Sequence, residues 1–171
     1  MKIRIPAILG AIVLLSGACA SVTTSADYDR STDFSRYRTW AWIENGEPVG
    51  NAIVQKRLTA AIEEQLAAKG LTKSDRPDLL VSMHARLTRR ATFETRSWGY
   101  GPGRWQTGVR TTPEEIPVGT LVVDLVDAGA KQLVWRGTAR RVLDLMASPE
   151  EKEKTTRETV ARMFAGYPPG R

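Results

Sequence analysis

Residues 119–143 read GTLVVDLVDAGAKQLVWRGTARRVL, and this stretch restricts most strongly how the chain folds. Apolar and polar positions alternate with a period of two on both sides of a short turn, which predicts two antiparallel strands. In that turn Asp127 is expected to accept hydrogen bonds from the following backbone, and Gly129 to take a left-handed conformation. We therefore predict a β-hairpin whose second strand carries Leu133 and Trp135 on one face.

Two more strands are predicted before this hairpin. Residues 37–43, YRTWAWI, are rich in aromatic and β-branched side chains, which favour strands. Residues 78–93, DLLVSMHARLTRRATF, alternate cleanly between apolar and polar positions, as in an antiparallel sheet with one covered face. Residues 94–118 have weak periodicity and many glycines and prolines, so they are either a long hairpin excursion or a mobile flap.

Two helices complete the pattern. Residues 51–69 repeat apolar side chains at spacings of three and four, and Gly70 follows them as a helix terminator. The second helix begins at Ser148, which forms a capping box with Glu151 around Pro149 in the first turn. Helices and strands with one apolar face each predict an α+β, two-layer sandwich, in which two helices cover a largely antiparallel sheet of about four to six strands.

The first residues indicate export. Lys2 and Arg4 precede an apolar run from Ile5 to Leu15, and small residues then lead to Cys19, in the order of a secretory signal. The run is shorter than the roughly 20 residues that a membrane-spanning helix needs. Residues 1–18 are therefore predicted to be a signal peptide.

Cys19 is the single cysteine, which excludes an intramolecular disulfide. The segment LSGAC resembles the bacterial lipobox, and this resemblance implies cleavage before Cys19, diacylglycerol on its sulfur and an acyl chain on its new amine. Several acyl chains hold a protein stably on a membrane where one does not. The alternative is an unmodified thiol in a discarded leader. Ala20 after the cysteine resembles the outer-membrane sorting pattern, which implies the periplasmic face of that membrane.

The mature chain is expected to contain one folded unit. Residues 19–36 are small, polar and aperiodic, and are interpreted as a lipidated flexible tether, followed by a single α+β domain at 37–171. Loss of Lys2 and Arg4 lowers the net charge from +6 to +4, a mild excess compatible with anionic surfaces. An exported protein is not expected to bind nucleic acid.

Several blocks together resemble one family. These are DYD and DFSRYRTWAW near the start, RPDLLVSMHA, GTLVVDLVDAGAKQLVWRGTA, and a last helix ending in YPP. They are similar to the bacterial lipoprotein family called domain of unknown function 4136, over about residues 27–169. The resemblance implies a small envelope lipoprotein with an α/β fold. It implies no catalytic residues.

The sequence contains weak candidates for catalysis or metal binding. His84 is the single histidine and is interpreted as a surface residue. It could form a catalytic pair with Asp124 only if their two strands pair in a register that brings the side chains into contact. One histidine and one cysteine exclude a tetrahedral nitrogen or sulfur metal site, and a calcium site at Asp124 and Asp127 is less favoured than a turn role for Asp127. The glycines at 99, 101 and 103 are interpreted as loop residues. No catalytic residue, metal or cofactor is therefore expected.

A cluster of arginines and aromatics is the strongest candidate surface. Arginine binds phosphate and carboxylate in a fork, and flat aromatics stack on sugars or enter a headgroup layer. The alternative is a solvated strand edge with aromatics packed over the sheet. Arg136, Arg140 and Arg141 would extend this surface if their strand is adjacent to the strand that carries the cluster. The candidate residues are Arg86, Arg89, Arg90, Trp98, Tyr100, Arg104 and Trp105.

These observations favour a lipid-anchored cell-envelope protein that binds or scaffolds at the membrane surface and has no enzymatic activity. One alternative is a module that binds glycan or lipid through the Arg/aromatic segment 86–110. Its partners would be the membrane through Cys19, and an anionic glycan, lipid headgroup or envelope protein. A less favoured alternative is an envelope hydrolase with an unrecognised site.

Overall fold

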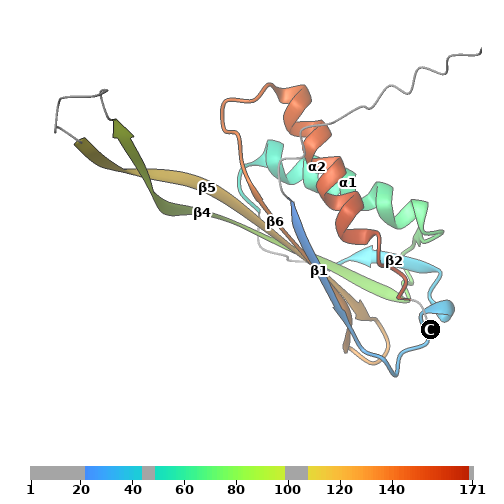
Figure 1. Ribbon diagram of the computed structural model, residues 1–171. Coiled ribbons are helices and arrows are strands. Elements are labelled where there is room, and N and C mark those ends of the chain that lie inside the picture. Colours follow the sequence, from blue (N-terminus) through green and yellow to red (C-terminus); the bar gives the residue numbers. More distant parts are fainter. Residues whose placement is uncertain (1–21, 44–48, 99–107, 170–171) are drawn as a thin grey trace, which may run out of the picture.

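Two helices lie on one face of a six-stranded sheet in the computed structural model, which describes residues 22–43, 49–98 and 108–169 (Figure 1). The strand order is β1-β6-β5-β4-β2-β3. The elements are β1 Thr23–Tyr28, the 3-10 helix Phe34–Arg36, β2 Thr39–Trp42, α1 Ala52–Ala68, β3 Thr72–Lys73, β4 Leu79–Trp98, β5 Gly108–Asp127, β6 Leu133–Val142 and α2 Pro149–Phe164. The predicted α+β sandwich is confirmed.

The sheet is antiparallel except at one edge. β1, β6, β5 and β4 pair antiparallel in that order, whereas β2 runs parallel to both β3 and β4. The parallel pair follows from the connection through α1, because a helix crossover returns the chain in the same direction. Neither helix within the described residues is long and apolar enough to span a bilayer.

The structure confirms the predicted roles of Gly70 and of the Ser148 capping box, and it adds a cap at Asn51. The Asn51 side chain accepts a hydrogen bond from the Val54 backbone at 3.0 Å, and Gly70 has a φ of 81° after the last turn of α1. At the start of α2, Ser148 and Glu151 exchange the two hydrogen bonds of the capping box, at 3.2 and 3.0 Å. These caps satisfy backbone donors that a helix leaves unpaired.

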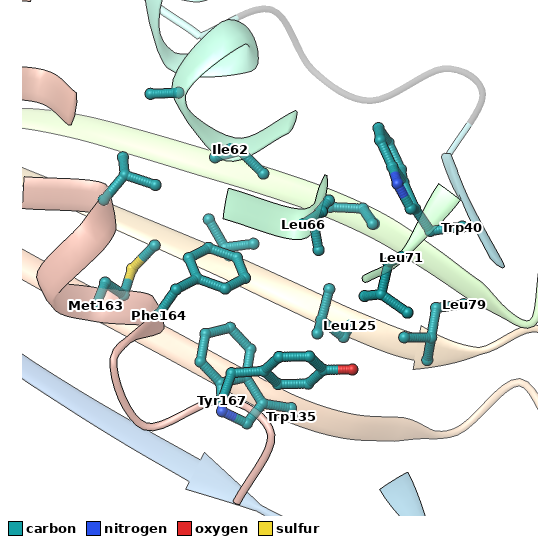
Figure 2. Close-up of a cluster of buried hydrophobic side chains, with 14 of the residues drawn as sticks. Trp40, Ile62, Leu66, Leu71, Leu79, Leu125, Trp135, Met163, Phe164 and Tyr167 are labelled. Atoms are coloured by element: carbon teal, nitrogen blue, oxygen red, sulfur yellow. The ribbon is translucent and has the colours of Figure 1, made fainter. Parts of the chain in front are cut away.

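The hydrophobic core lies between the helices and the sheet (Figure 2). Trp135 is fully buried and contacts Phe164 and Tyr167, with ring centroids 5.0 and 5.4 Å apart. Alternate residues of β4 and β5 point to this side, so the predicted alternation is correct. The fully buried large side chains are Trp135, Phe164, Ile62, Leu66, Leu79, Leu125, Val81, Val123 and Val160.

The segment interpreted as a flexible tether, 19–36, is ordered over most of its length. Residues Thr23–Tyr28 form the edge strand β1, paired with β6 from Thr23–Arg140 to Tyr28–Trp135. All six side chains of β1 are exposed, so backbone hydrogen bonds hold the strand in the sheet. Because no side chain is buried, the sequence of β1 shows no alternation of apolar and polar residues. The folded unit therefore begins at residue 23 and not at residue 37.

The turn before β6 also differs from expectation. Asp127 accepts hydrogen bonds from the backbone of Gly129 and Ala130 at 2.9 and 2.8 Å, as predicted. The left-handed residue, however, is Lys131, with a φ of 57°, and not Gly129. The hydrogen bonds to Asp127 hold Gly129 and Ala130 at negative φ angles, so the residue with positive φ comes later in the turn, at Lys131.

Candidate binding surfaces

The largest feature outside the core is a two-stranded ribbon made by β4 and β5. The two strands pair without interruption from Leu79–Asp127 to Trp98–Gly108. β6 accompanies β5 only as far as the pair Val118–Val142. We call the part beyond it, residues 89–98 and 108–117, the arm. At roughly 3.3 Å per residue the arm is about 30 Å long, and it projects past the helices (Figure 1).

The arm exposes apolar and charged side chains together. Phe93 is 72% exposed, and the Arg89 guanidinium lies 3.6 Å from the Glu115 carboxylate across the ribbon. Both strand edges of the arm are open within the described residues, and open edges pair readily with other chains. The irregular segment 94–118 is thus a hairpin excursion, at least up to Trp98 and from Gly108.

The predicted Arg/aromatic cluster is only partly brought together. Tyr100, Arg104 and Trp105 lie outside the described residues, as does the glycine pattern at 99–103, and nothing is described for the Trp98 side chain. By strand register, Arg86 and Arg90 face away from the helices, whereas Arg89 lies on the opposite face of β4. The cluster therefore divides between the two faces of the ribbon.

The face of the sheet away from the helices carries several arginines. Thr120 pairs with Arg86 on one side and with Arg140 on the other, so the two arginines share this face with one strand between them. Arg140 thus lies on the same face as Arg86, although β5 separates their two strands. Arg141 alternates to the helix side, where it donates to the Thr155 carbonyl at 3.0 Å.

The conditional pairing of His84 with Asp124 is not formed. β4 and β5 do pair, but His84 lies opposite Val122, and Asp124 lies opposite Ser82. Asp124 is instead held by Arg136, whose Nε and Nη2 atoms donate to its two carboxylate oxygens at 2.6 and 2.7 Å. The arginine fork neutralises this carboxylate, and the pKa of Arg136 is raised by the hydrogen bond to Asp124.

Asp127 has a structural role at the turn before β6. Its position alternates with that of Asp124, so the two carboxylates lie on opposite faces of β5, and no acidic or histidine cluster suited to a metal occurs among the described residues. Asp127 accepts a hydrogen bond from the Tyr37 hydroxyl at 2.9 Å and forms an ion pair with Arg36. Backbone N–H groups, first that of Ala130, lower the pKa of Asp127.

A second carboxylate joins β2 to the start of β4. Asp78 accepts hydrogen bonds from the Arg38 and Thr39 backbones and from the Thr39 hydroxyl, each at 2.9 Å. The Arg38 backbone bond is the main cause of the lowered pKa of Asp78. These contacts hold the start of β2 beside the start of β4.

A cavity of about 500 Å³ lies at the base of the arm. It is lined by residues 49–51 with the first two turns of α1, one side of α2, the connection between β6 and α2, and strands β4 to β6. Sequence patterns do not reveal it, because its walls come from six separate segments. One signal was present: the run VLDLM at 142–146 places apolar residues in a connection, where Leu145 is 52% exposed and Met146 92% exposed. The lining side chains include Val54, Leu58, Leu87, Leu121, Ala139, Leu143, Leu145 and Val160.

A family model describes almost the whole folded unit. The model of the domain of unknown function DUF4136 matches residues 24–169, which spans β1 through the end of α2. The chain belongs to the DUF4136 family. The predicted family resemblance is confirmed, and the match to DUF4136 begins inside β1, in agreement with the earlier start of the fold. No curated protein matches the sequence significantly.

Solved structures share the fold of this DUF4136 member at low sequence identity. A PDZ domain protein from Parabacteroides distasonis has a TM-score of 0.60 and 17% identity, over 88% of this chain and 36% of that chain. The DUF4136 chain thus spans about a third of that protein's length. The PelC dodecamer from Paraburkholderia phytofirmans has a TM-score of 0.51 and 11% identity, over 84% of this chain and 95% of that chain. At these identities the likeness extends to the fold alone.

Proposed function

We propose that this DUF4136 protein is a lipid-anchored binding protein of the bacterial cell envelope, and that the arm is its contact element. The observation that carries the proposal is the arm itself. No layer of the described residues packs over the arm, and a two-stranded ribbon on its own is marginally stable in water. A partner that covers Phe93 and pairs with an open strand edge would stabilise it.

The lipid anchor is proposed from the leader and from the short connection to the fold. Cys19 lies three positions before Val22, the first described residue, and an extended chain spans at most about 11 Å over that distance. Acyl chains on Cys19 would therefore hold the folded body close to the bilayer, on the periplasmic face of the outer membrane.

The partner we propose is anionic: a glycan, a lipid headgroup or an acidic envelope protein. Arg86, Arg90 and Arg140 support this, because they are exposed on the same open face of the sheet. Self-association is the alternative. The PelC structure is described as a dodecamer, and an open edge of the arm suits strand pairing between copies.

Binding without catalysis is part of the proposal. His84 is exposed on an open sheet face, and Asp124 is occupied by Arg136. General acid–base chemistry needs a base within hydrogen-bond reach of its partner, and the described residues offer no such pair around His84. The hydrolase alternative therefore has no supporting observation.

The test uses the mature chain with Cys19→Ala, so that sedimentation with isolated envelope fractions reports contacts of the folded body. Changing Arg89 and Arg90 together to Glu should reduce co-sedimentation strongly, while the circular dichroism spectrum stays unchanged. Changing Arg30 and Arg76 to Glu is the control, because both are exposed, lie far from the arm in sequence and carry the same charge. Equal co-sedimentation of the two double variants would refute an arginine-dependent arm contact.

A further inference from the structure

The cavity at the base of the arm has the dimensions and surface of a ligand site. Its volume of about 500 Å³ falls within the roughly 300–1,000 Å³ of small-molecule pockets. It lies between the helices and the sheet, at the end of the sheet from which the arm leaves. A ligand in this cavity would be separate from the partner proposed for the arm, and either could bind without the other.

The interior of the cavity suits an aliphatic chain. Apolar side chains from both helices, from β4, β5 and β6 and from the connection after β6 line it, and no aromatic ring occurs among its described lining residues. Sugars and nucleobases are usually held by stacking on flat rings, which this wall lacks. Leu87 and Leu145 are lining residues that remain more than half exposed, so apolar surface is left uncovered at the cavity.

The polar part of the lining is cationic. The lining cation Arg86 faces away from the helices by strand register, whereas Arg57, Arg141 and Lys152 lie on the helix side, against the single carboxylate of Asp144. Within the described residues none of these three cations has a carboxylate partner. Arg141 donates to the Thr155 carbonyl and the Thr159 hydroxyl, and the Lys152 ammonium donates to the Leu145 carbonyl at 2.8 Å. An anionic group in this cavity would gain charge-assisted hydrogen bonds.

The cavity is also near the point at which the chain enters the fold. Thr23, the first residue of β1, pairs with Arg140, which lies between the lining residues Ala139 and Arg141. Cys19 precedes Thr23 by four residues, about 14 Å of extended chain. An anchor on Cys19 would thus hold this end of the sheet close to the source of membrane lipids.

We infer that the cavity binds a single-chain anionic lipid, with the acyl chain among the aliphatic side chains and the carboxylate or phosphate on Arg57, Arg141 and Lys152. The apolar interior accounts for the acyl chain, and the cations that have no carboxylate partner among the described residues account for the headgroup. A zwitterionic lipid of the same chain length carries no net negative charge to balance the cationic side chains, and it therefore binds less tightly.

The probe is cis-parinaric acid, a fatty acid whose fluorescence rises in an apolar site, added to the mature chain with Cys19→Ala. Palmitate and lysophosphatidylglycerol should both displace it, and their relative strength distinguishes a fatty acid from a phospholipid as the ligand. Lysophosphatidylcholine should be about tenfold weaker than lysophosphatidylglycerol, because it lacks the net negative charge.

Two pairs of variants locate the site. Ala85→Phe adds a ring to an exposed lining position and should weaken binding about tenfold or more, whereas Ala91→Phe, on the same face of β4 but outside the cavity, should bind normally. Changing Arg57 and Lys152 to Glu should remove the preference for anionic lipids. Changing Lys56 and Lys154 to Glu, exposed positions on the same two helices, should not. Absence of saturable binding, or equal affinity of Ala85→Phe and the parent chain, would overturn the inference.

Discussion

The indole of Trp135 covers Gly137 so closely that a Cβ at position 137 would stand 2.4 Å from the indole Cη2 atom. The same Cβ would lie 2.8 Å from Met163 of α2. The glycine thus lets the largest core side chain lie flat along β6 while α2 packs above it. This arrangement joins the hairpin of residues 119–143 to the second helix and makes it the centre of the fold.

Gly137→Ala should therefore destabilise the protein by about 1–3 kcal/mol, since overpacking forces the indole or α2 to move. Urea unfolding followed by tryptophan fluorescence measures the change. Gly166→Ala is the matched control, because no atom lies within 4 Å of the added Cβ. A change below about 0.5 kcal/mol at position 137 would show that the core adapts freely there.

Tyr37→Phe should lower the free energy of unfolding by about 1 kcal/mol. The substitution keeps the buried ring and removes the hydroxyl that donates to Asp127. Tyr28→Phe serves as the control, since Tyr28 is exposed and its hydroxyl makes no hydrogen bond within the described residues. Equal stability of the two variants would mean that the Tyr37 hydroxyl contributes nothing to the fold.

Stability should fall in acid because of Asp78 and Asp127. The fold lowers the pKa of both carboxyls from the ordinary value of 3.8, so the unfolded chain binds protons more readily than the folded chain. Their contribution is fully present well above pH 3.8 and is lost as the pH falls below that value and through the lowered pKa values. Urea unfolding across this range measures it, and Asp127→Asn should flatten the dependence. A constant free energy of unfolding would contradict the assigned hydrogen bonds.

Cys19→Ala should move the protein from the membrane fraction to the soluble periplasmic fraction and abolish labelling by palmitate. The reason is that the acyl chains of the proposed anchor are attached through Cys19. Ser21→Ala, two residues further along the mature chain, should leave both properties unchanged. Normal lipid labelling of the Cys19→Ala variant would exclude the anchor.

Much of the fold follows from local patterns in the sequence. Apolar spacing places α1 within one residue of its observed ends, and the Ser148 capping box identifies the start of α2. Alternation separates the buried and exposed faces of β4 and β5. These features are local, so a residue and its near neighbours suffice to predict them.

Other parts of the fold depend on distant partners. β1 has only exposed side chains and exists because β6 offers it backbone hydrogen bonds, which its own sequence cannot reveal. The parallel pairing of β2 with β4 likewise depends on the packing of α1. The cavity combines residues from Val49 to Val160. The sequence predicts the Arg/aromatic cluster as one surface, yet strand register sends Arg89 and Arg90 to opposite faces.

Photo-crosslinking from the arm in living cells tests the central claim most directly. With p-benzoylphenylalanine in place of Phe93, illumination should give discrete adducts, whereas the same residue in place of Glu158, exposed on α2, should give none. An adduct between two copies would identify self-association, and an adduct with another envelope component would identify a separate partner. Absence of adducts from position 93, or the same adducts from both positions, would contradict the arm as the contact element.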